Sequence, residues 1–210
     1  NDTTRATAIT QKDGVPVLSG SCSVGGTSYA EGRLRHVGSV KITTTGQTED
    51  SDANRFVWNR DNQKFRRLRA TPAYVDNNAV ESYTHNSTTY AALNGGTGAT
   101  FNFICGDVTE IDVSMFLVGS STGANKQARP GIGIDSVSTP ESTEYYSENN
   151  VGASTSLAIR NLKTLAYGAH YCTALLQVTS GLTFTIYADL QRNGGSVDPL
   201  ATYMEGHILG

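Results

Sequence analysis

The clearest alternation of apolar and polar residues lies near the C-terminus. From Leu182 to Leu190 every second residue is apolar, and the residues between them are Thr, Thr, Tyr and Asp. A period of two is typical of a β-strand with one face in the core and the other in water. A turn-rich segment, 191–196, follows. Residues 200–209 are then predicted as a second strand, which ties the end of the chain into a sheet.

The same period recurs through the second half of the chain. It predicts strands over residues 100–105, 110–118, 157–165 and 169–178. The side chains expected to face the core are Phe101, Phe103, Cys105, Ile111, Val113, Met115, Leu117, Cys172, Ala174, Leu176 and Val178. About eight strands with connections of variable length favour an all-β, antiparallel β-sandwich of the jelly-roll type.

The first part of the chain alternates more weakly. Residues 56–59 are predicted as a strand and 64–70 as the return strand of the same hairpin. Pro72 and the polar run 76–78 indicate a passage to the second part, and a compact continuation is an equal alternative. We therefore expect an N-terminal segment rich in β-hairpins, residues 1–72, and a jelly-roll head, residues 73–210.

Two long segments lack the strand period. Residues 119–133 are predicted as a loop, or as two loops around a short apolar step. Residues 136–152 form the longest polar stretch of the chain. Loops on a stiff scaffold are where binding residues concentrate, so this polar stretch is a candidate binding segment.

Composition and charge narrow the function. Of 210 residues, 38% are hydrophobic and 17% charged, which is lean but globular. A net charge of −3 argues against a nucleic-acid partner, because phosphate binding needs a basic surface. No apolar run approaches the roughly 20 residues of a membrane span, so we expect no membrane insertion. The chain begins at Asn1 with sequence that looks like the middle of a domain, so we expect a fragment or processed product of a longer protein.

Residue types that carry most enzyme chemistry form no recognisable motif. Three cysteines cannot make a closed disulfide framework, and Cys105 and Cys172 are expected as buried thiols. Four histidines share no spacing, so we expect no metal and no other cofactor. Carboxylate pairs of the glycosidase kind could be built only from acids scattered along the chain. These acids are Asp112, Glu141, Glu144 and Glu205. We expect no enzymatic activity.

Positive charge gathers between residues 55 and 69. Six basic residues stand there against Asp61 alone: Arg55, Arg60, Lys64, Arg66, Arg67 and Arg69. They could contact an anion or an acidic polysaccharide, or they could pair with acids on neighbouring strands. Trp58, the one tryptophan, is similarly either a core anchor or a platform for a ligand.

Several strings in the first 70 residues carry a resemblance. They are Asn1-Asp-Thr-Thr-Arg-Ala-Thr-Ala-Ile-Thr, Lys12-Asp-Gly-Val-Pro-Val, Arg35-His-Val-Gly-Ser, Gly46-Gln-Thr-Glu-Asp-Ser and Arg55-Phe-Val-Trp-Asn. In this order they resemble a segment of tailed-bacteriophage virion proteins. The ending, residues 201–210, is similar to the last strand of trimeric jelly-roll heads in phage fibres and spikes. Members of that family often carry paired tyrosines where this chain has Arg60-Asp61, so no contact at that hairpin tip is carried over.

The resemblance implies a virion protein that attaches a bacteriophage to its host. Such tail fibres, head fibres and spikes are usually homotrimers, and this one would bind a bacterial surface polysaccharide. The part of the protein upstream of Asn1 would join it to other virion proteins.

The polar stretch 136–152 is the candidate glycan site, because a sugar site needs aromatic faces beside polar groups. We predict Glu144, Tyr145, Tyr146 and Asn149 as glycan-binding residues. Alternatively, one tyrosine packs on the sheet and the other closes a subunit contact. The alternative function is a trimerisation or folding cap, without a receptor site, for a longer fibre or polysaccharide depolymerase.

Overall fold

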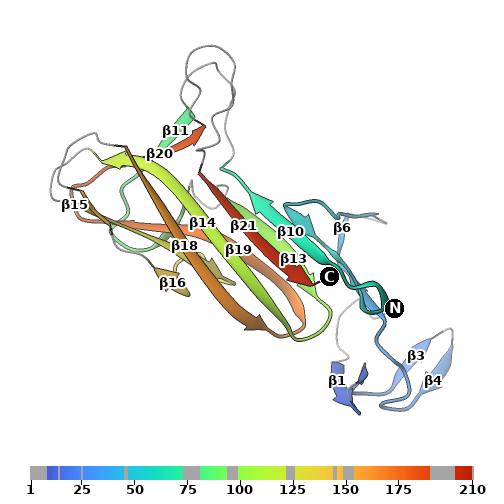
Figure 1. The fold of residues 1–210 in the computed structure, drawn as a ribbon. Helices are drawn as coiled ribbons and strands as arrows, with labels where there is room; N and C mark the ends of the chain where they lie inside the picture. Colours follow the sequence, from blue (N-terminus) through green and yellow to red (C-terminus); the bar gives the residue numbers. More distant parts are fainter. Residues whose placement is uncertain are drawn as a thin grey trace.

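A computed structural model describes most of the chain. The described residues are 9–13, 15–24, 26–44, 47–72, 81–93, 99–121, 126–143, 146–148, 154–189 and 202–209. Nearly all of their regular structure is β, and residues 60–62 form a 3-10 turn, η1 (Arg60–Asn62). Figure 1 shows two packed sheets, with small hairpins at one end and the β11–β20 pair at the other.

The part of the chain that the structure describes contains no helix with the length and apolarity that a membrane crossing requires.

The first sheet is built around a single long strand. Its four main strands lie in the order β10 (Phe65–Ala70), β21 (Tyr203–Leu209), β14 (Thr109–Ser121) and β18 (Ser154–Leu165), and each neighbouring pair is antiparallel. Residues 112–116 of β14 pair with β21, and residues 119–121 pair with β20 (Phe184–Asp189). β20 in turn pairs with β11 (Glu81–His85).

The second sheet packs against the first. Its strands lie in the order β13 (Thr100–Cys105), β19 (Gly168–Val178) and β15 (Lys126–Ile134), followed by β16 (Ser142–Thr143) and β17 (Tyr146–Glu148), which both pair with β15. The short β12 (Ala91–Ala92) also pairs with β19, and β8 (Asn54–Arg55) runs parallel to β13.

The strand order identifies the type of sandwich. We count β16 and β17 as one strand and number the eight main strands 1 to 8 along the chain. In the first sheet the spatial order is 1, 8, 3, 6 (β10, β21, β14, β18). In the second sheet it is 2, 7, 4, 5 (β13, β19, β15, β16 with β17). Every pair within this set is antiparallel, and the order is that of a jelly roll. The predicted fold class, an all-β antiparallel sandwich, is confirmed.

The N-terminal part consists of small two-stranded sheets, as expected. The pairs are β1 (Ile9–Lys12) with β2 (Val15–Leu18), β3 (Cys22–Val24) with β4 (Thr27–Tyr29), β5 (Gly38–Val40) with β9 (Val57–Asn59), and β6 (Ile42–Thr44) with β7 (Gln47–Thr48). The division at residue 72 stays a prediction, and β10, on its N-terminal side, pairs with β21.

The core lies between the two sheets. All eleven side chains expected to face inward from 100–105, 110–118 and 169–178 are buried, and so are Leu182, Phe184 and Ile186 of the opening alternation. Strict alternation is therefore a correct guide to the buried faces of the long strands.

Two sequence predictions about pairing and loops are wrong. Residues 56–59 and 64–70 are not a hairpin, because β9 pairs with β5 while β10 joins the sandwich through β21. Residues 119–133 are predicted as a loop, or as two loops around a short apolar step, but 119–121 belong to β14 and 126–134 form β15. Pro130 and two glycines made this segment look unlike a strand. One of these glycines, Gly133, is required by the packing, because a Cβ there would overlap the carbonyl oxygen of Ser136.

Cys105 and Cys172 are buried free thiols, as predicted. Burial, with a smaller contribution from the charge of Asp135, raises the pKa of Cys105 to about 12. The same two causes raise the pKa of Cys172 above the ordinary value of a thiol. Since the thiolate is the reactive form, neither thiol is available to reagents while the sandwich is folded.

Thiol labelling tests this burial. In a Cys22→Ser variant, we expect a thiol reagent at about pH 8 to modify essentially no cysteine in the native protein and two per chain in denaturant. Labelling would be counted by mass spectrometry. Rapid modification of either remaining cysteine without denaturant would contradict the packing of β13 against β19.

Candidate functional site

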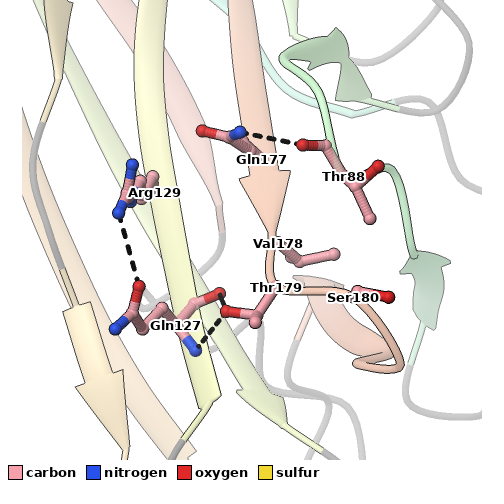
Figure 2. Close-up of a pocket in the computed structure, with 7 residues that line it drawn as sticks. All are labelled: Thr88, Gln127, Arg129, Gln177, Val178, Thr179 and Ser180. Carbon is pink, nitrogen blue, oxygen red and sulfur yellow. Dashed lines mark hydrogen bonds between the residues drawn. The ribbon is translucent and has the colours of Figure 1, made fainter.

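A small polar pocket lies on the outer face of the second sheet, at the end of the sandwich where β11 and β20 extend (Figure 1, Figure 2). Its volume is about 190 Å³. The lining residues are Thr88, Gln127, Arg129, Gln177, Val178, Thr179 and Ser180. They come from three segments: the start of β15, the end of β19 with its following turn, and the connection between β11 and β12.

Strand alternation places the polar side chains on this outer face. Ala128 and Val178 lie opposite each other in the β15–β19 register, and both are buried in the core. Arg129 and Gln177, the next pair in that register, therefore point away from the core. The residue pattern of two ordinary strands is enough to build this wall of the pocket.

Thr179 connects β15 and β19 by hydrogen bonds at the pocket. Its hydroxyl accepts a hydrogen bond from the backbone N–H of Gln127 at 3.0 Å and donates to the carbonyl of Gln127 at 3.2 Å. The backbone N–H of Thr179 donates to the same carbonyl at 3.0 Å. The pairing of β15 with β19 thus continues one residue beyond the end of β19.

The third segment is held by one side chain and one backbone bond. Gln177 Nε2 donates a hydrogen bond to the carbonyl oxygen of Thr88 at 2.8 Å. The backbone N–H of Val178 donates to the carbonyl oxygen of Ser87 at 2.9 Å. On the other side, Arg129 Nη2 lies 3.4 Å from Gln127 Oε1 (Figure 2). Thr88, Gln177 and Arg129 therefore form a row across three adjacent segments.

The side chains of the pocket could form hydrogen bonds with a small polar ligand. Its side chains offer amide and hydroxyl groups that donate and accept, together with the donor fork of one guanidinium. Pockets for drug-sized ligands hold about 300–1,000 Å³. A volume of about 190 Å³ suits one small polar group, such as a single sugar residue of a longer chain.

The predicted glycan residues cannot be compared with the pocket side chain by side chain. Glu144, Tyr145 and Asn149 lie outside the described residues, and of Tyr146 only the backbone is described. That backbone belongs to β17, where Tyr146 is the partner of Ala128 in β15. The role of all four residues stays a prediction.

Sequence reasoning missed the residues that line the pocket. Gln127 and Arg129 fall in the predicted loop 119–133, Gln177 lies on the face of predicted strand 169–178 that is opposite the core, and Thr179 follows that strand. Alternation around Ala128 and Val178 is the signal that could have put them on one face. No sequence signal shows that Thr88 closes the third side.

The carboxylates considered for polysaccharide cleavage have ion-pair partners where they are described. Two hydrogen bonds from Arg160, at 2.7 and 2.6 Å, hold the pKa of Asp112 below its usual range. Glu141 pairs with Lys163, and Glu205 Oε1 lies 3.7 Å from His207 Nε2. A lowered pKa is the opposite of what a general acid needs, so Asp112 is placed as the partner of a cation.

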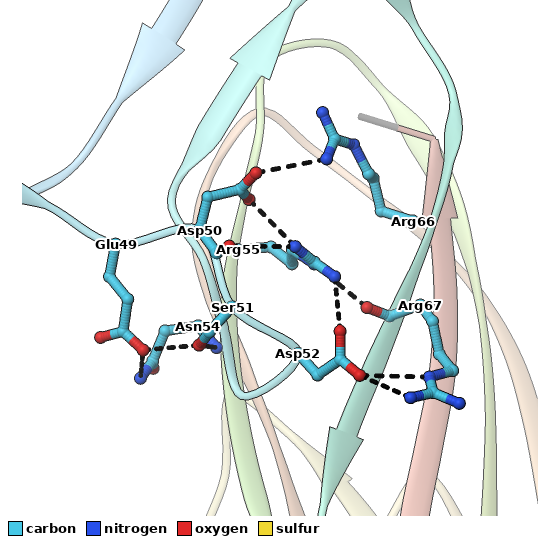
Figure 3. A network of polar contacts seen from close by, with 8 residues as sticks. All are labelled: Glu49, Asp50, Ser51, Asp52, Asn54, Arg55, Arg66 and Arg67. Atoms are coloured by element: carbon cyan, nitrogen blue, oxygen red, sulfur yellow. Dashed lines mark hydrogen bonds and ion pairs between the residues drawn. The ribbon is translucent and has the colours of Figure 1, made fainter.

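Three of the six basic residues at 55–69 pair with two acids just before the cluster. Asp52 binds both Arg55 and Arg67 at 2.6 Å, and Asp50 lies 3.2 Å from Arg66 (Figure 3). Hydrogen bonding from Arg67 is the main cause that lowers the pKa of Asp52. Pairing with acids on neighbouring segments is therefore the better of the two interpretations for these three arginines.

Trp58 is a core anchor, with only 2% of its surface exposed. Its ring stacks on the imidazole of His36, with the two ring centroids 5.3 Å apart and an angle of 5° between the ring planes. Gly106 also lies against the ring, and a Cβ there would overlap it. This stack attaches the N-terminal segment to the β13–β14 turn. Burial is the main cause that lowers the pKa of His36.

No group of three or more His, Cys, Asp or Glu that could hold a metal ion occurs among the residues described in the structure.

Comparison with known proteins yields limited similarity. No protein-family model and no curated protein sequence matches the chain. Among solved structures, it overlaps those of infectious bursal disease virus of the Gt and Gx strains, each with a TM-score of 0.35. Identity is 14% over 93% of this chain and 47% of the Gt chain, and 12% over 93% and 48% for Gx. The chain spans about half the length of these solved chains. An overlap of this size assigns neither a family nor an activity.

The pH dependence of stability tests the Trp58–His36 stack. The fold favours neutral His36, so below the ordinary pKa of 6.5 the unfolded chain takes up a proton before the folded chain does. We expect the unfolding temperature to fall as the pH is lowered from about 7.5 to about 5, and to fall less in His36→Gln.

Burial also lowers the pKa of His85, so a His36→Gln, His85→Gln double variant should show a still flatter profile. Thermal melts followed by circular dichroism would measure each slope. Identical slopes in the wild type and in His36→Gln would contradict the placement of the imidazole against Trp58.

Proposed function

We propose that this chain is the jelly-roll head of a bacteriophage virion attachment protein, a fibre or spike, that binds a glycan on the host cell surface. The observation that carries the proposal is the polar pocket between β15, β19 and Thr88. It combines side-chain amides, hydroxyls and a guanidinium on a scaffold fixed by backbone hydrogen bonds.

Two further observations support the proposal. The jelly-roll strand order is the architecture implied by the similarity of residues 1–70 and 201–210 to phage virion proteins. The pocket also lies at one end of the sandwich, where connections between strands meet, and such connections carry recognition on rigid β scaffolds. Under this proposal the partners are a bacterial surface polysaccharide, sister chains of a homotrimer and upstream virion components.

Glycan binding by the purified chain tests the proposal. We expect binding to at least one polysaccharide on an array of bacterial capsules and lipopolysaccharides. A Gln127→Ala, Gln177→Ala double variant should bind about tenfold or more weakly, because both amides of the pocket are removed. Binding would be measured by biolayer interferometry with immobilised polysaccharide.

Matched controls separate the pocket from the rest of the surface. Ser156→Ala and Thr164→Ala alter exposed residues of β18 on the other sheet and should bind as the wild type does. A Tyr145→Ala, Tyr146→Ala variant tests the predicted 144–149 site in the same assay. Absence of glycan binding by the wild type would overturn the attachment proposal and favour the alternative function.

That alternative, a trimerisation or folding cap without a receptor site, is favoured by exposed apolar side chains. Phe65 is 82% exposed and Leu162 is 59% exposed, and register and burial place both on the outer face of the first sheet. Tyr203 and Phe116 lie on the same face, with their rings 5.7 Å apart. A surface with these residues is suited to contact with another chain.

Light scattering tests trimerisation. We expect a mass about three times the 22.3 kDa of one chain at micromolar concentration. A Phe65→Ser, Leu162→Ser variant should shift the mass toward the monomer, because it makes the outer face of the first sheet polar. Val137→Ser, at a site that is 54% exposed outside that sheet, is the control. A wild-type monomer would contradict assembly through this face.

A further inference from the structure

We propose that residues 49–55 form a strap that closes one side of the sandwich and can open while the two sheets stay packed. Adjacent backbone carbonyls of the strap reach different sheets. The carbonyl oxygen of Asp52 accepts a hydrogen bond from the N–H of Arg69 in β10 at 2.8 Å. The carbonyl oxygen of Ala53 accepts one from the N–H of Asn102 in β13 at 2.9 Å. The strap therefore bridges the first sheet and the second.

An ionic latch holds the strap to β10 (Figure 3). The carboxylate of Asp52 lies 2.6 Å from the guanidinium groups of both Arg55 and Arg67. The carboxylate of Asp50 lies 3.2 Å from the guanidinium of Arg66. Arg55 Nε also donates a hydrogen bond to the carbonyl oxygen of Arg67 at 3.1 Å. Since Arg66 and Arg67 belong to β10, these five side chains connect the strap to the edge of the first sheet.

The strap is held by polar contacts, without an anchor in the core. Its one apolar residue is Ala53, which is only half-buried. The latch is also open to solvent, because the side chains of Asp52 and Arg67 are 42% and 49% exposed. Exposed ion pairs are weak and are screened by salt. A segment with few buried apolar contacts opens at a lower free energy than the core does.

The base of the strap has the opposite character and serves as a hinge. Phe56 is 4% exposed and packs with Trp58 and Ile104 in a small apolar cluster. Its N–H donates a hydrogen bond to the carbonyl oxygen of Glu49 at 3.1 Å, which joins the two ends of the strap. Residues 50–55 can therefore lift away as a unit from a fixed base. Lifting uncovers backbone groups at the edges of β10 and β13, and uncovered sheet edges can pair with added strands.

Amide hydrogen exchange tests the strap. We expect the amide protons of Arg69 and Asn102 to exchange about fivefold or more faster in Asp52→Asn than in the wild type, because the latch loses its central charge. Amides in the middle of β14 and β19 should keep their wild-type rates. Added salt should speed up exchange at Arg69 and Asn102 in the wild type, and less so in the variant. NMR resolves each of these amide protons.

Asp112→Asn is the matched control, because it removes a carboxylate that accepts two hydrogen bonds from Arg160, away from the strap. It should leave exchange at Arg69 and Asn102 as in the wild type. Unchanged exchange at these two amides in Asp52→Asn would overturn the proposal. Equal acceleration at the strap and in the middle of β14 and β19 would overturn it as well, because the strap would then open only when the whole sandwich unfolds.

Discussion

The pairing of β21 with both β10 and β14 is the constraint on which the sandwich depends. The strands β10 and β14 are separated along the chain by residues 71–108. In the first sheet they are connected only through β21. The core beneath them, including Leu68 and Met115, closes once β21 is in place. Loop-closure entropy must be spent before such distant contacts can stabilise the fold, so we expect slow folding in which the sheet is completed late.

This closure also explains what the sequence could and could not predict. Strict alternation over 100–105 and 110–118 marks buried faces, because each strand packs one side on the core wherever its partners lie. The partner of β10 leaves no such mark, since Leu68 and Ala70 would face a core in a local hairpin as well as in a distant pairing. Periodicity specifies which face is buried, and it says nothing about which strand lies alongside.

The pocket was harder to predict for a related reason. Its polar residues alternate with buried Ala128 and Val178, and alternating polar residues ordinarily indicate a water-facing strand. What converts that face into a pocket is Thr88, brought in from another part of the chain by Gln177. Pro130 added a second obstacle, because a proline inside a strand pattern argues against a strand in any reading of sequence alone.

The two ends of the sandwich have different chemistry, with aromatic packing at one end and a polar pocket at the other. At one end, Trp58 is buried against His36 and Gly106. At the other end, backbone hydrogen bonds hold β15 and β19 together, while the side chains of Gln127, Arg129 and Gln177 line a pocket. The scaffold bonds at the pocket come from the backbone, from Thr179 and from Gln177, so Gln177 supports the fold of this end as well as lining the pocket.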